Sequence, residues 1–181
     1  MDAVKILFQI RRLESALLMQ YIRLSSACEI DVANLLGLSF DQVRQLKDTP
    51  SDIQANLVTS FNANTSTLFT LSSFEESRAT FSDLELDEIR QIRSLERKIV
   101  LELRELCLRF PTIAFGCCGL SRSQIDQLIT FSSSELTEHC YTKKSRILKI
   151  RFNPRGLLEL ARVASKPCFS QFAWLHDKLA I

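Results

Sequence analysis

Two segments of the chain repeat one spacing of apolar residues. In each segment the apolar positions follow one another at intervals of three, three, four, four and three residues, which is the seam of an amphipathic helix. The first seam is Leu7, Ile10, Leu13, Leu17, Tyr21 and Leu24, and the second is Ile89, Ile92, Leu95, Ile99, Leu103 and Leu106. Long helices are therefore predicted at about 3–26 and 84–109. Because long, narrow seams are typical of helices that pair, we expect these two to pack together.

The two seams belong to an internal repeat with an offset of 82 residues. Gln9-Ile10-Arg11-Arg12-Leu13-Glu14 returns as Gln91-Ile92-Arg93-Ser94-Leu95-Glu96, and Gly37-Leu38-Ser39 returns as Gly119-Leu120-Ser121. From residue 9 to residue 46, twelve of thirty-eight positions are identical without a gap, which is too many for chance. The repeat predicts two copies of one helical unit, at 1–71 and 87–152, related by an approximate twofold axis.

Each unit also predicts a helix-turn-helix. A short apolar helix, at about 29–36 and 111–118, runs into a glycine, the residue that most often ends a helix in the left-handed conformation. Ser39 and Ser121 then stand where an N-cap belongs, and a third helix follows to about Lys47 and Thr130. A helix, a glycine-containing turn and a capped helix form the layout of this motif.

The remaining elements of each unit are a fourth helix and a short strand. The fourth helices are expected to begin in 49–52 and 132–135, and the period-two alternation of 67–71 and 146–152 indicates one strand each. The fold class is thus mainly α with a little β structure.

Two further segments complete the predicted organisation. Residues 72–86, rich in Ser and Glu, are expected to link the units. Residues 153–181 have no counterpart in the first unit and predict a helical extension. Its aromatic residues would either fill the core or form a docking surface.

Charge is distributed unevenly between the two units. Residues 1–85 hold seven basic and eleven acidic residues, a net of −4, whereas 86–181 hold sixteen and ten, a net of +6. Most of the excess lies in a basic cluster between residues 143 and 166, which contains a single acid, Glu159. Such a cluster fits either a nucleic-acid or acidic-partner surface or a solvated face. Its basic residues are Lys143, Lys144, Arg146, Lys149, Arg151, Arg155, Arg162 and Lys166.

Several other classes of protein are disfavoured. No run of eighteen apolar residues is long enough for a membrane span, and the N-terminus lacks the layout of a signal peptide, so we expect a cytoplasmic protein without a membrane partner. With only two histidines and no nucleotide-binding or nucleophile motif, we expect no enzyme, no cofactor and no small-molecule substrate. His139 could serve as a general base, but a surface or packed role is the simpler interpretation.

The six cysteines raise the question of a metal site. No two of them stand in a CxxC pair. A site built from Cys117-Cys118 and His139-Cys140 is conceivable, but adjacent cysteines in an apolar helix are more often small core residues. We therefore expect thiols without zinc and without a required disulfide.

From about Leu95 to Phe152 the second unit resembles the bacterial flagellar regulator FlhD. The resemblance rests on the long leading helix, the Gly119-Leu120-Ser121 turn, the capped helix after it, Leu136 and the closing Ile150-Arg151-Phe152. The first unit resembles the same outline through Gly37-Leu38-Ser39 and 68–71, without the basic end. Family members usually contain one unit, so the tandem arrangement suggests that one chain replaces a pair of subunits.

The resemblance implies a subunit of a heteromeric transcription activator. In that family FlhD pairs with FlhC, a zinc-binding partner, and the two bind double-stranded promoter DNA of flagellar or conjugative-transfer genes. An FlhC-like subunit and DNA are therefore the expected partners. The alternative is a helical adaptor that acts through protein contacts and does not bind DNA.

Candidate DNA contacts are placed on two elements. The N-terminal half of the second helix of a helix-turn-helix normally reads bases, and Gln and Arg can contact base edges. The basic stretch that follows would contact phosphates, with sequence reading shared with the partner. The candidates are Arg122, Gln124, Lys143, Lys144, Arg146, Lys149, Arg151 and Arg155.

Overall fold

The computed structural model describes residues 2–36, 39–48, 67–71, 87–142 and 147–150, and these are mainly helical. The first unit contributes three described helices and a strand, and the second contributes four helices and a strand. In chain order the elements are α1 (Ala3–Ala27), α2 (Glu29–Leu36), α3 (Phe40–Lys47), β1 (Phe69–Leu71), α5 (Asp87–Arg109), α6 (Pro111–Cys118), α7 (Arg122–Thr130), α8 (Ser133–Thr142) and β2 (Leu148–Ile150).

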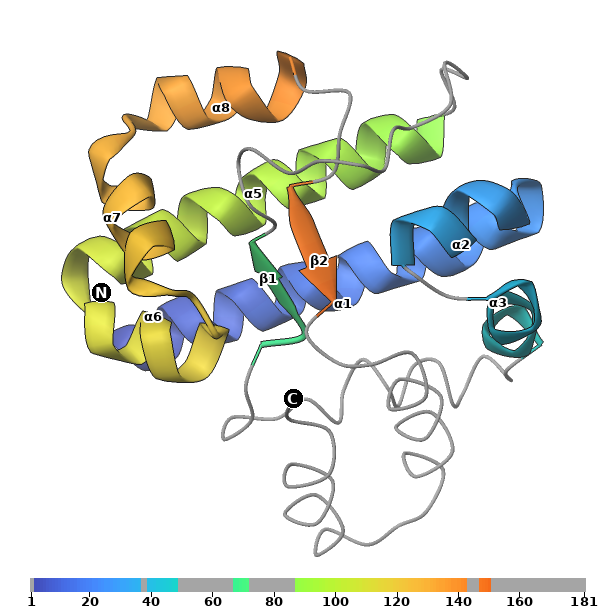
Figure 1. Ribbon diagram of the computed structural model, residues 1–181, viewed down its shortest axis with the longest axis horizontal. Coiled ribbons are helices and arrows are strands. Elements are labelled where there is room, and N and C mark those ends of the chain that lie inside the picture. The colour runs from blue at the N-terminus through green and yellow to red at the C-terminus, as the bar shows by residue number, and fades with distance from the viewer. Residues whose placement is uncertain (1, 37–38, 49–66, 72–86, 143–146, 151–181) are drawn as a thin grey trace, which may run out of the picture.

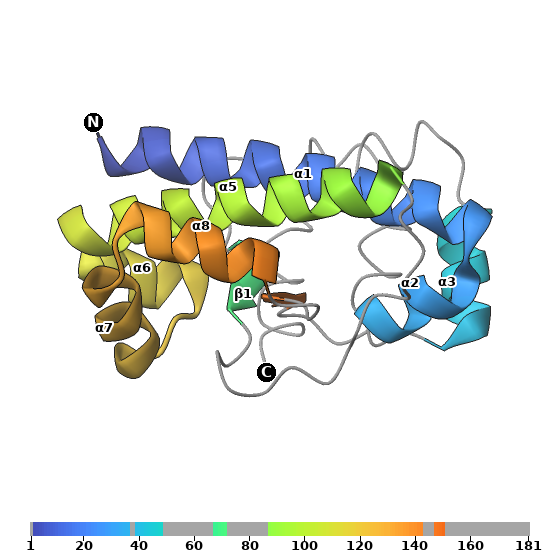
Figure 2. The same cartoon turned by 90° about the horizontal axis from the view of Figure 1, so that it is seen from above.

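The long helices α1 and α5 pack side by side and run in opposite directions (Figures 1 and 2). Their contact is the most extensive between described elements. All twelve predicted seam positions lie in or against the core at the expected helical spacing, and Leu17, Tyr21, Ile99 and Leu106 are fully buried. The predicted pairing of the two helices is therefore confirmed.

The short helices form two pairs at opposite ends of the long-helix layer. Figure 1 shows α6 and α7 beside the N-terminal end of α1, and α2 and α3 beside its C-terminal end. Figure 2 shows the same separation from above. Helix α8 lies along α5. The α2–α3 pair and the α6–α7 pair thus lie at opposite ends of the long helices.

The strands β1 and β2 pair with each other across the middle of the long helices (Figure 1). The pairing is antiparallel, with Thr70 opposite Lys149 and Leu71 opposite Leu148. A strand is confirmed in each of the two alternating stretches, at Phe69–Leu71 and Leu148–Ile150. The sequence pattern did not predict that the strand of one unit would pair with the strand of the other.

A buried carboxylate fixes the first strand to α1. Glu14 is only 3% exposed, and its two carboxylate oxygens accept the backbone N–H groups of Leu68 and Phe69 at 3.1 and 2.9 Å. The Arg11 guanidinium lies close enough for an electrostatic interaction with Glu14, although desolvation by burial lowers the pKa of Arg11. Because charge-assisted hydrogen bonds are stronger than neutral ones, this contact sets the position of β1.

A second buried carboxylate lies at the corresponding position of the other unit. Glu96, 82 residues after Glu14, is 2% exposed and accepts a hydrogen bond from the Tyr21 hydroxyl at 3.4 Å. The Tyr21 ring in turn packs against Phe69, with ring centroids 6.3 Å apart. Both carboxylates are thus used to join α1, α5 and the small sheet.

Four predicted segments lie outside the described residues. They are the first unit's fourth helix, expected to begin in 49–52, the linker 72–86, the start of the basic stretch in 143–146 and the extension 153–181. The second unit's fourth helix is confirmed as α8. No described helix is long and apolar enough to cross a membrane.

Candidate nucleic-acid interface

The turn between α6 and α7 has the geometry that its sequence predicts. Gly119 adopts the left-handed conformation with φ 60° and ψ 31°, which a side chain would strain. Ser121 caps α7: its hydroxyl accepts the Gln124 N–H at 3.2 Å, and the Gln124 amide oxygen accepts the Ser121 N–H at 2.8 Å. This reciprocal pair is a capping box, which fixes where α7 begins.

The same pair of hydrogen bonds begins α3 in the first unit. The Ser39 hydroxyl accepts the Gln42 N–H at 3.3 Å, and the Gln42 amide oxygen accepts the Ser39 N–H at 2.9 Å. Serine and glutamine at this spacing therefore specify the same helix start in both units. The predicted N-caps are both confirmed.

The first unit's strand supports the second unit's turn. The Thr67 N–H donates to the Cys117 carbonyl at 2.9 Å, and the Thr70 hydroxyl donates to the Gly119 carbonyl at 3.2 Å. On the other side of the turn, the Gln124 amide nitrogen donates to the Leu71 carbonyl at 3.0 Å. The α6–α7 segment is thus positioned by β1, and neither unit alone would hold it in the same way.

One side of α7 packs against the core and the other faces outward. Ile125 and Leu128 are buried, and the Arg104 side chain of α5 donates to the Phe131 carbonyl at 2.6 Å, just after the helix ends. The outward side forms an open hollow. Its lining residues are Arg122, Ser123, Asp126, Gln127, Thr130 and Phe131.

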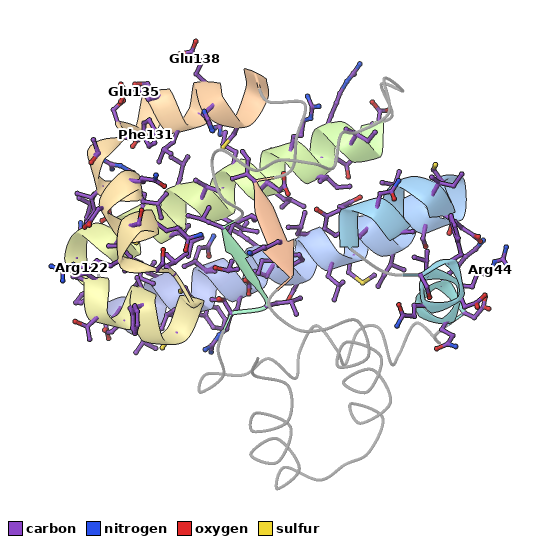
Figure 3. All side chains as sticks on the ribbon, viewed as in Figure 1. Arg44, Arg122, Phe131, Glu135 and Glu138 are labelled. Atoms are coloured by element: carbon purple, nitrogen blue, oxygen red, sulfur yellow. The ribbon has the colours of Figure 1, made fainter. Side chains whose placement is uncertain are left out.

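Arg122 is the cation of this surface. It is exposed at the first position of α7, points outward at one end of the molecule (Figure 3), and makes no ion pair with the described residues. A cation at the N-terminus of a helix adds to the positive end of the helix dipole, where phosphate groups bind. Asp126, one turn later on the same side, adds a negative charge that would favour contact with a base donor over contact with phosphate.

Gln124, the second predicted contact on α7, has a structural role. Its amide oxygen and nitrogen are both engaged, in the capping box and with the Leu71 carbonyl, and the side chain is only partly exposed. It therefore supports the turn, and a DNA contact would have to displace one of these bonds. Gln127 and Thr130, which follow Arg122 and Ser123 at helical spacing, occupy the outward positions that the sequence interpretation overlooked.

Lys149 is the one described member of the basic stretch. It is exposed on β2, opposite Thr70 in the sheet register, while its neighbour Leu148 is buried. The alternation predicted from the sequence thus places this lysine toward solvent. The remaining candidates, Lys143, Lys144, Arg146, Arg151 and Arg155, lie outside the described residues.

Three of the described cysteines are buried, and His139 packs against an aromatic ring. Burial raises the pKa of the Cys107, Cys118 and Cys140 thiols to about 12, which keeps them protonated at neutral pH. His139 is partly buried and stacks on Phe131 with centroids 6.2 Å apart. Among the described residues, no group of three or more His, Cys, Asp or Glu side chains could hold a metal ion.

Comparison with protein-family models, with curated proteins and with solved structures gives no match to this chain.

Proposed function

We propose that this protein is a subunit of a heteromeric bacterial transcription activator, and that its α6–α7 end faces promoter DNA. The observation that carries the proposal is the outward side of α7. It follows a glycine turn, begins with the exposed Arg122 and continues with Ser123, Asp126 and Gln127. These side chains are of the kinds that contact phosphates and base edges from a helix in the major groove.

The proposed ancestry is a duplicated FlhD-like unit with an approximate twofold axis between the copies. Three features support it: the described elements follow one another in a similar order in both units, the long helices are antiparallel, and the capping pairs match. In this proposal the chain replaces two subunits, and an FlhC-like protein binds beside it. The partner would supply sequence reading that one arginine and one aspartate on α7 cannot supply alone.

The basic stretch of the second unit would add phosphate contacts. Lys149 supports this part because it is exposed on β2. Lysines in such a position contribute affinity without sequence preference, and each phosphate contact releases counterions. The proposed DNA surface therefore combines a reading helix with an electrostatic edge.

The test compares two double substitutions in the full chain. R122A with K149A should weaken binding to a mixed-sequence 25-base-pair duplex and reduce the slope of log affinity against log salt by about 2. The matched control is R44A with K47A, which removes two basic residues from α3. Those residues are already paired with Glu29, so binding should change little.

An unchanged affinity and salt slope in the R122A/K149A variant would refute DNA contact through this end. The adaptor function would then be favoured, and it has an observation of its own. Phe115 on α6 is 61% exposed, which is unusual for a large aromatic side chain and typical of a protein-contact surface.

A further inference from the structure

An open groove lies between the N-terminal part of α1 and the second half of α5. Its lining residues are Val4, Lys5, Phe8, Gln9 and Glu102, and its volume is about 500 Å³. Val4 and Phe8 are 60% and 64% exposed, so one helical turn presents two neighbouring apolar side chains to solvent. Figure 2 shows the two long helices side by side along this part of the molecule.

Val4 and Phe8 form an apolar ridge that is separate from the buried side of α1. Ala3, Ile6 and Ile10 are the buried positions of this segment. Val4 and Phe8 are therefore additional to the seam that pairs α1 with α5. The corresponding position in the second unit differs, because Arg90 replaces Phe8 and pairs with Asp87 at 3.5 Å. The second unit therefore carries a charged side chain where the first unit exposes the Phe8 ring.

Two opposite charges, Lys5 and Glu102, flank the ridge. Lys5 and Glu102 make no hydrogen bond or ion pair with the described residues, although they line the same groove. Glu102 is partly buried, and desolvation followed by repulsion from Glu105 raises its pKa. A cation brought close to Glu102 would relieve both effects.

We propose that this groove is a self-association surface whose occupant is a second copy of this chain. A twofold axis through the groove would pack the two Phe8 side chains together and place each Lys5 against the partner's Glu102. Such an isologous contact satisfies both charges on both copies at once. A partner segment of one charge sign would satisfy only one of them.

The proposed dimer is weak and does not depend on the proposed DNA function. Its apolar part is two side chains per copy, well below the roughly 800 Å² per partner of a standard stable interface. Affinity would therefore come from Phe8 as the central anchor, with the paired charges fixing the orientation.

Sedimentation velocity of the full chain over a concentration series tests the proposal. The sedimentation coefficient should rise with concentration, and F8D should weaken the association roughly tenfold or more. The matched control is F40D, which adds the same charge at an exposed aromatic residue of α3, outside the groove, and should leave association unchanged. A monomer at concentrations up to about 1 mM, or equal loss in both variants, would overturn the proposal.

Charge reversal supplies a second test that does not rely on Phe8. K5E alone and E102K alone should each be monomeric. In a dimer of either variant, both contacts between position 5 of one copy and position 102 of the other would join like charges. An equimolar mixture of the two variants should associate again, because every contact across the axis then joins opposite charges. If the mixture sediments as the two variants do separately, the twofold pairing is wrong.

Discussion

The helices α3 and α7 begin with the same capping pair, but their basic side chains differ in whether they form ion pairs. On α3, Arg44 and Lys47 reach the Glu29 carboxylate at 3.1 and 3.5 Å, so both cations of this helix are paired within the first unit. On α7, Arg122 has no such partner among the described residues. The two arginines lie at opposite ends of the molecule (Figure 3).

The difference is visible in the sequence at the offset of 82 residues. Glu29 corresponds to Pro111, which begins α6 and carries no charge, and Arg44 corresponds to Asp126, so neither partner of the α3 ion pair is repeated. Arg122 stands at the position that Phe40 occupies in the first unit. Pro is well suited to the first turn of a helix, so the exchange leaves the helix intact. The serine–glutamine cap and the buried helix seam are thus alike in both halves, while the surface charges differ.

The largest expected effect concerns the support of the α6–α7 end. E14A removes the acceptor of two buried N–H groups and leaves Arg11 buried without that carboxylate. Loss of one partner from a buried charged network costs about 3–5 kcal/mol of unfolding free energy. Urea denaturation followed by circular dichroism measures it. A loss under about 1 kcal/mol would show that Glu14 does not hold β1.

The second prediction concerns the contribution of the basic stretch to DNA binding, apart from that of α7. Replacing Lys143, Lys144 and Arg146 together with Ala should weaken binding to every duplex and flatten the salt slope by about 2 to 3. Fluorescence anisotropy in a salt series measures both quantities. Loss of partner binding with an unchanged salt slope would assign this stretch to a protein interface instead.

The third prediction compares the two turns directly. G119A should cost about 1–2 kcal/mol, because the left-handed conformation brings a Cβ too close to the following carbonyl oxygen. Gly37 lies outside the described residues, and the repeat predicts the same cost for G37A. Thermal unfolding of the two variants measures the costs. If G37A were as stable as the unsubstituted chain while G119A was destabilised, the two turns would differ, and this would count against a duplication.

The smallest effect lies at the start of α8. Hydrogen bonds from the Ser132 side chain and backbone hold the pKa of Glu135 below its ordinary value. The resulting stabilisation is present above the unfolded-state pKa and is lost as pH falls through the lowered folded-state value. S132A should raise the pKa of Glu135 while the backbone bond keeps it from full recovery. Titration followed by NMR measures the shift, and no change would exclude the hydroxyl as a cause.

The sequence by itself determined the helices and their starts. Helical hydrogen bonds join residues four apart, so the seam of α1, the glycine of the α6–α7 turn and the Ser121–Gln124 spacing all carry their information locally. The same local rules placed Arg122 on the surface at the beginning of α7, and the alternation of β2 placed Lys149 outward.

Only the tertiary structure decided which elements pair and which side chains form hydrogen bonds between distant segments. The pairing of β1 with β2 joins residues about eighty positions apart, and no local pattern encodes a strand's partner. Gln124 had the composition of a base-reading residue, yet the Leu71 carbonyl of that distant strand engages its amide. Glu14 had the pattern of a surface residue on an amphipathic helix and is buried, because the backbone of β1 needs its oxygens. A side chain's role follows from the groups that folding brings within hydrogen-bonding distance, and those groups come from both halves of the chain.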